Sequence, residues 1–174
     1  MIEVFSDLIK ILLPAGLVLL GIYLTIESLL KKQFEKTVVE IRSKNVEIIL
    51  PVRLQAYERM ALFLERISPH NLILRINQPN MTSAELQAVM LHEMREEYNH
   101  NLSQQIYISE VCWTLIRNAF EEVISSINTC ALQTEPEKAS IELARRIFEL
   151  QMNRGGDSIQ KAMSELKSEI SVYY

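Results

Sequence analysis

The feature that most constrains the fold is an apolar run near the N-terminus. It reads ILLPAGLVLLGIYLTI at residues 11–26 and contains no charged residue. If the charged residues at its two ends reach the interface, the run extends over residues 8–30, and about 20 apolar residues suffice to cross a bilayer. Positive charge follows the run, at Lys31, Lys32 and Lys36, whereas in a cleaved signal peptide it precedes the run. We therefore predict a single-pass transmembrane helix, with the N-terminus outside and the rest of the chain in the cytoplasm.

The composition favours helices and argues against two kinds of binding site. The chain has four glycines and five prolines, so turns are few and helix-forming residues dominate. Two glycines lie in the apolar run and the other two are adjacent at positions 155 and 156, which leaves none for a phosphate-binding loop. The net charge of −4 disfavours a nucleic-acid partner, because phosphate binding needs a concentrated positive face.

The two cysteines, Cys112 and Cys130, are predicted to be reduced, buried thiols. On one helix their spacing sets them about 27 Å apart, far beyond the reach of a disulfide. A nucleophilic pair formed by one of these thiols and a histidine stays open from sequence alone. However, both cysteines lie among apolar residues, where a thiol is usually inert.

Signals for helix ends divide the rest of the chain into amphipathic helices. The prolines at positions 51 and 69 bound one broadly apolar helix, and Thr82 followed by Glu85 has the spacing of a capping box at the start of the next. Three further boundaries are expected, at Ser109, at Thr134 with Glu137, and at Gly155-Gly156 followed by the capping residue Asp157.

These boundaries predict an all-α fold, in which the transmembrane helix is followed by an antiparallel bundle of about five helices. We expect three parts: an N-terminal segment over residues 1–30, a juxtamembrane helix over 31–50, and a cytoplasmic bundle over 51–174. The segments 72–76, LILRI, and 104–108, QQIYI, show partial alternation of apolar and polar residues, so a short two-stranded ribbon stays open.

The juxtamembrane helix carries a seam of residues at alternating spacings of four and three, typical of a coiled coil. The seam consists of Phe34, Val38, Ile41, Asn45 and Ile48. Asn45 occupies a core-type position, where asparagine can fix the register of a self-associating stalk. Because the seam spans barely two heptads, the alternative is a connecting helix whose apolar stripe packs on its own domain.

The stretch HEMREEYNHN, residues 92–101, is the one candidate for a metal site. His92, Glu96 and His100 lie one helical turn apart, and Glu97 with His100 has the Glu-x-x-His form used in di-iron bundles. Such bundles need a second pair on another helix, and the sequence contains no other Glu-x-x-His. We therefore expect a water-facing or partner-facing stripe with no bound metal or cofactor, and keep a metal-binding bundle enzyme using these four residues as the alternative.

Two stretches, LPVRLQAYERMALFLERISP and EEYNHNLSQQIYIS, downstream of one membrane segment, resemble a family of small bacterial single-pass membrane proteins that share a domain of unknown function. The resemblance extends over most of the chain and implies a fold shared around these two helices, but no activity. The helices carry complementary polar groups for a helix–helix contact or a docking face. On the first they are Arg53, Tyr57, Glu58, Arg59, Glu65 and Arg66, and on the second Glu97, His100, Asn101, Gln104 and Gln105.

The sequence contains a membrane segment and amphipathic helices, but no complete catalytic set. We therefore expect a non-enzymatic interaction module, held at the bacterial inner membrane by residues 8–30, that serves as an accessory or scaffold subunit. Its expected partners are the bilayer and either an unidentified membrane or cytoplasmic protein or a second copy of the chain.

Overall fold

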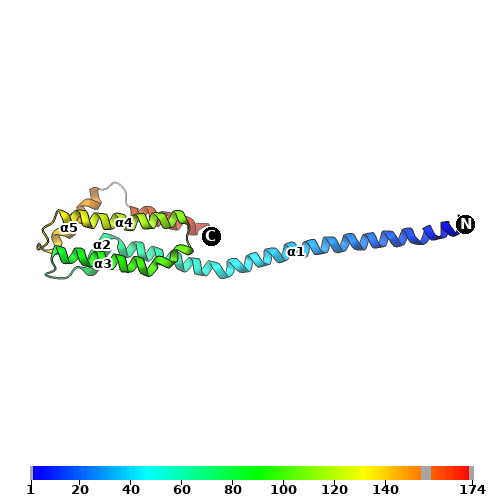
Figure 1. Ribbon diagram of the computed structural model, residues 1–174, viewed down its shortest axis with the longest axis horizontal. Coiled ribbons are helices and arrows are strands. Elements are labelled where there is room, and N and C mark those ends of the chain that lie inside the picture. The colour runs from blue at the N-terminus through cyan, green and yellow to red at the C-terminus, as the bar shows by residue number, and fades with distance from the viewer. Residues whose placement is uncertain (1, 154–157, 173–174) are drawn as a thin grey trace. The chain divides into compact units, whose positions relative to one another are not determined.

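The computed structural model describes residues 2–153 and 158–172, and these residues form helices and turns without a β-strand (Figure 1). The prediction of an all-α fold is confirmed. Side chains are described from Gly16 onward, except at positions 39, 41–43 and 45–46. The chain divides into two compact units, Met1–Leu50 and Pro51–Tyr174. The helices are α1 (Ile2–Ile67), α2 (Pro69–Ile76), α3 (Ser83–Asn101), the 3-10 helix η1 (Leu102–Ile106), α4 (Glu110–Leu132), α5 (Ser140–Asn153) and α6 (Ser158–Ser171).

The first unit is helical and exposes large apolar side chains. Leu17 and Leu30, near the two ends of the described part of the apolar run, are 62% and 61% exposed. Within the residues described, no helix is long and apolar enough to cross a membrane. The transmembrane helix predicted over residues 8–30 is therefore not supported by the structure, and the side chains before Gly16 lie outside its described part.

Pro51 does not end a helix, and the predicted boundary there is wrong. Helix α1 includes Pro51 and ends at Ile67, just before Pro69 opens α2 at its N-terminus. A proline inside a helix removes one backbone hydrogen bond, and α1 continues on both sides of Pro51. By contrast, Pro69 stands at the first position of a helix, where the missing N–H has no helical partner to lose.

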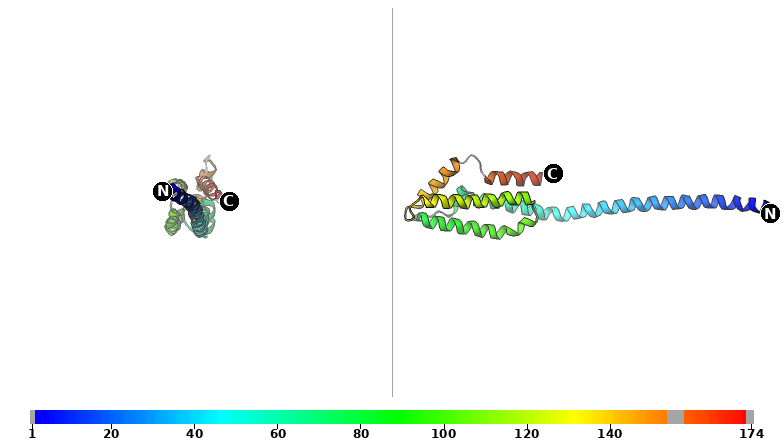
Figure 2. Two further views of the ribbon diagram at one scale, coloured as in Figure 1. Left: turned by 90° about the vertical axis from the view of Figure 1, so that its right-hand side faces the viewer. Right: turned by 45° about the horizontal axis from the view of Figure 1, so that its top comes forward.

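In the second unit, the helices surround a single apolar core. Helix α4 packs against α3, α5 and α6, and α2 packs against α3 and α5 (Figures 1 and 2). Apolar side chains at helical spacing supply the core, as the sequence predicts, with Leu86, Met90 and Met94 of α3 and Ile116 and Ile127 of α4 all fully buried.

An aromatic cluster joins three of the helices inside this core. The Tyr98 ring stacks on Phe120 with ring centroids 4.5 Å apart and on Trp113 with centroids 5.8 Å apart. Phe63, which is 1% exposed, packs against both Tyr98 and Phe120. The segment of α1 that belongs to the second unit is therefore held by the same core as α3 and α4.

The capping box predicted at Thr82 is confirmed. The Thr82 hydroxyl accepts a hydrogen bond from the Glu85 backbone N–H, while the Glu85 carboxylate accepts one from the Thr82 backbone N–H. The hydrogen bonds that the Thr82 backbone N–H and then its hydroxyl donate to the Glu85 carboxylate hold the pKa of Glu85 below its usual value. Ser109 caps α4 in the same manner, through the backbone N–H of Cys112.

The structure settles one point that the sequence left open and corrects one predicted boundary. Residues 72–76 lie in α2 and residues 104–108 lie in or just after η1, so they form no ribbon. The boundary expected at Thr134 and Glu137 moves to Ser140, where α5 begins. Long-range hydrogen bonds explain the change of boundary, because the carbonyls of Pro136 and Lys138 accept from the first residues of α3 and hold this segment out of a helix. The predicted break at Gly155, Gly156 and Asp157 lies outside the described residues.

Candidate functional site

Some of the predicted polar residues of α1 and α3 face one another across the two helices. The Arg66 guanidinium lies 3.1 Å from a carboxylate oxygen of Glu97, which is 16% exposed in its side chain. The Asn101 amide donates to the Glu97 backbone carbonyl at 2.8 Å and to its carboxylate at 3.2 Å. Glu97 therefore joins the two helices, and its carboxylate is already engaged by an arginine and an amide.

The other polar residues of this face leave their groups available for a partner. They line an open cleft of about 490 Å³ between α1 and α3, which we call the polar cleft. Among the described residues, Glu58, Arg59 and His100 have no hydrogen-bonding or ion-pair partner, and Leu62 beside them is 55% exposed. The lining residues are Gln55, Glu58, Arg59, Leu62, Arg66, Glu97, His100 and Asn101.

Two other polar residues named from the sequence form local contacts instead, and a third is exposed. Glu65 accepts hydrogen bonds from the amide of Asn71, at the end of α1. Gln104 donates to the neighbouring Ser103 hydroxyl at 3.3 Å, and Gln105 is exposed. None of these contacts spans the two helices.

Arg53 and Tyr57 enter a second polar network, centred on the carboxylate of Glu169 in α6. The Tyr57 hydroxyl donates to Glu169 at 2.8 Å and the Arg53 guanidinium lies 3.2 Å from it. The Ser109 backbone N–H and hydroxyl both donate to the same carboxylate, at 2.9 and 2.8 Å. Arg53 also donates to the backbone carbonyl of Tyr107 at 2.9 Å. This Glu169 network ties α1, α6 and the start of α4 together.

Sequence reasoning missed Glu169 as the partner of Arg53 and Tyr57, and Ser109 as a second donor to its carboxylate. One signal was present: Glu169 stands three residues after Leu166 and directly before Ile170, at the edge of the apolar stripe of α6. A carboxylate at that edge is placed to be drawn into the core boundary. Its partner, however, lies more than 100 residues away in the chain, and no local pattern records such a pairing.

The buried thiol of Cys112 lies beside this network. Burial, followed by the charges of Glu169 and Glu165, raises its pKa to about 12. The thiol therefore stays protonated at neutral pH, and a protonated thiol is a weak nucleophile. Cys130 is also a free, buried cysteine, so the predicted burial of both is confirmed.

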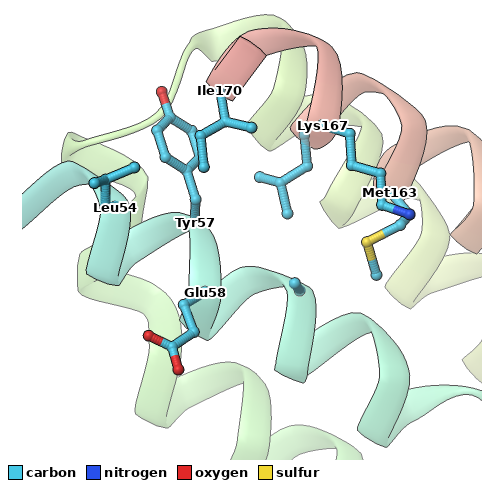
Figure 3. Close-up of a pocket in the computed structure, with 8 residues that line it drawn as sticks. Leu54, Tyr57, Glu58, Met163, Lys167 and Ile170 are labelled. Atoms are coloured by element: carbon cyan, nitrogen blue, oxygen red, sulfur yellow. The ribbon is translucent and has the colours of Figure 1, made fainter. Parts of the chain in front are cut away.

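An apolar groove runs along the other side of α1, against α6 (Figure 3). Its volume is about 290 Å³. Leu54 and Tyr57 face Met163 and Ile170 across it (Figure 3), with Glu58 on the α1 side and Lys167 on the α6 side. Ala61 and Leu166 complete its lining.

The residues considered for a metal site do not converge. His92, Glu96 and His100 are exposed on α3, while Glu97 is paired with Arg66. Within the described part of the chain, no group of three or more His, Cys, Asp or Glu side chains is placed to hold a metal ion.

Comparison with known proteins places the chain in one family. The sequence model of a family of unknown function, DUF7935, matches residues 3–173. The chain belongs to this family. The matched residues extend over both units of the chain. No curated protein and no solved structure matches the chain.

Proposed function

We propose that the protein is a membrane-anchored helical interaction module, a non-catalytic accessory or scaffold subunit of a complex in the bacterial inner membrane. The observation that carries the proposal is the run of exposed apolar side chains on α1. From Gly16 to Leu30 the only charged residue is Glu27. Exposed apolar surface of this extent is rare on a soluble protein and marks a contact with lipid or with another protein.

The distribution of these side chains around the helix favours lipid. Leu17, Val18, Leu19 and Leu20 are consecutive and each is more than half exposed. Successive residues on a helix point about 100° apart, so these four cover every direction. A partner helix covers one stripe, whereas a bilayer covers all sides. In the sequence the apolar run begins at Leu8, which gives the length of about 20 residues needed for a span.

Charge next to the run supports an orientation. Lys31, Lys32 and Lys36 are exposed immediately after it, and positive flanks are retained on the cytoplasmic side. The proposal therefore places the N-terminus outside and the bundle in the cytoplasm, close to anionic lipid headgroups that attract these lysines.

The polar cleft supports the second half of the proposal, binding of a protein partner. It holds an unpaired guanidinium at Arg59, an unpaired carboxylate at Glu58 and an exposed apolar side chain at Leu62. A partner surface that offers a carboxylate to Arg59 and an apolar contact to Leu62 fits these groups. Arginine is frequent at protein interfaces because its planar guanidinium binds carboxylates in a bidentate manner.

Extraction of vesicles with alkaline carbonate tests the anchor. The full chain, reconstituted in vesicles that contain anionic lipid, is expected to stay with the membrane. The double variant Leu20→Arg, Leu24→Arg is expected to lose membrane retention, because each arginine at the centre of a span costs about 3 kcal/mol.

The matched control adds the same two charges outside the apolar run. Gln33→Arg, Thr37→Arg changes two exposed positions and is expected to be retained as well as the unmodified chain. Release of the unmodified chain by carbonate would contradict the proposed anchor.

A further inference from the structure

We infer that the protein self-associates in parallel through the seam on α1, with a second copy of the chain as the partner. The seam consists of Phe34, Val38, Ile41, Asn45 and Ile48. This inference deepens the proposed function and, in one respect, rests on it. Two heptads are short for a coiled coil, which usually has about three or four, so concentration of the copies in one bilayer assists pairing.

Of the three seam side chains that the structure describes, two are exposed and Val38 is half-buried. Phe34 and Ile48, near its two ends, are 72% and 70% exposed. The side chains of Ile41 and Asn45 lie outside the described residues, and their place in the seam follows from their spacing in the sequence.

This part of α1 differs from the apolar run in having a polar side. Lys36 and Glu40 form an ion pair one turn apart, with their side chains 79% and 57% exposed. In the heptad that the seam defines, they take the outer positions. The helix therefore has a charged side away from the seam, as expected of a helix that meets another helix rather than being surrounded by lipid.

The residue types in the seam favour pairing with a second copy of the chain, with the two helices parallel. The spacing of four from Phe34 to Val38 makes Val38 and Asn45 the a positions and Phe34, Ile41 and Ile48 the d positions. In coiled coils, one β-branched residue and one asparagine at the positions labelled a are typical of parallel pairing. In a parallel, in-register pair Asn45 meets Asn45 of the other copy and the two amides hydrogen-bond. An antiparallel pairing sets each asparagine against an apolar residue and leaves its amide unsatisfied.

Disulfide cross-linking of the full chain in vesicles tests the inference. In a parallel pair the Ile48→Cys side chains of two copies meet, so mild oxidation is expected to give a linked species of twice the 20.1 kDa of one chain. Glu40→Cys is the matched control, because it lies on the outer side of the same helix. The two native thiols are buried, and oxidation of the unmodified chain measures any cross-linking that forms through them.

A second substitution separates a specific contact from random collision. Val38→Asp in the Ile48→Cys chain is expected to abolish the linked species, whereas Lys36→Asp is expected to leave its yield unchanged. Equal linking at positions 40 and 48, or linking that survives Val38→Asp, would overturn the inference. Carbonate extraction of the same vesicles reports the anchor independently, so a failure of self-association is distinguished from a failure of membrane attachment.

Discussion

Replacing Glu169 by alanine is expected to lower the free energy of unfolding by about 3 kcal/mol, because removal of one partner of a largely buried ion pair leaves the others uncompensated. The Glu169 carboxylate is 14% exposed and the Arg53 side chain 28%. The Glu169 carboxylate accepts from the Arg53 guanidinium and from the hydroxyls of Tyr57 and Ser109. The substitution removes this shared acceptor and leaves the three donors at the core boundary without it.

Chemical unfolding of the full chain, followed by the fluorescence of Trp113, measures this loss. Glu142→Ala is the matched control, because it also breaks a pair between glutamate and arginine, with Arg145, but at an exposed site. Exposed pairs contribute about 0–1 kcal/mol. A loss of stability in Glu169→Ala no larger than that in Glu142→Ala would show that the Glu169 network does not hold α1, α6 and α4 together.

Replacing Phe63 by alanine is expected to cost about 3–5 kcal/mol, the usual range for a buried aromatic residue. Phe63 is 1% exposed and packs on the rings of Tyr98 and Phe120. Its removal leaves a cavity inside the aromatic cluster, and the contacts that attach the α1 segment to α3 and α4 are lost there.

The adjacent residue is a direct control for this prediction. Leu62 is 55% exposed, and surface substitutions usually change stability by no more than about 0.5 kcal/mol. Unfolding midpoints of Phe63→Ala and Leu62→Ala are therefore expected to differ strongly, although the two positions are neighbours on one helix. Equal midpoints would mean that the α1 segment is not part of the core.

Local sequence rules predicted those elements whose signals act within one or two helical turns. The capping box of Thr82 and Glu85 fixed the start of α3, and the spacing of Leu86, Met90 and Met94 identified its buried side. Each of these depends on a side chain and a backbone group only a few residues apart, so the sequence contains all that is needed.

The same rules failed where distant parts of the chain decide the outcome. Thr134 and Glu137 have the spacing of a capping box, yet backbone hydrogen bonds to the start of α3 keep this segment out of a helix. The pairing of Arg53 with Glu169 joins residues from opposite ends of the second unit. In each case a long-range contact outweighs a local preference.

The candidate site was predictable in part for the same reason. The sequence named the helices and most of the residues that line the polar cleft, since they stand at regular positions on α1 and α3. It did not separate residues that pair within the fold, such as Arg66 and Glu97, from residues that remain open, such as Arg59 and His100. That distinction depends on distances across two helices.

Affinity purification of the full chain from detergent-solubilised membranes, with quantitative mass spectrometry, tests the central claim most directly. We expect a co-purifying protein that is lost in Arg59→Glu, in the polar cleft, and retained in Arg117→Glu, an exposed position of α4 with the same change of charge. Recovery of the chain alone, as a monomer, would contradict the proposal that the bundle is an interaction module.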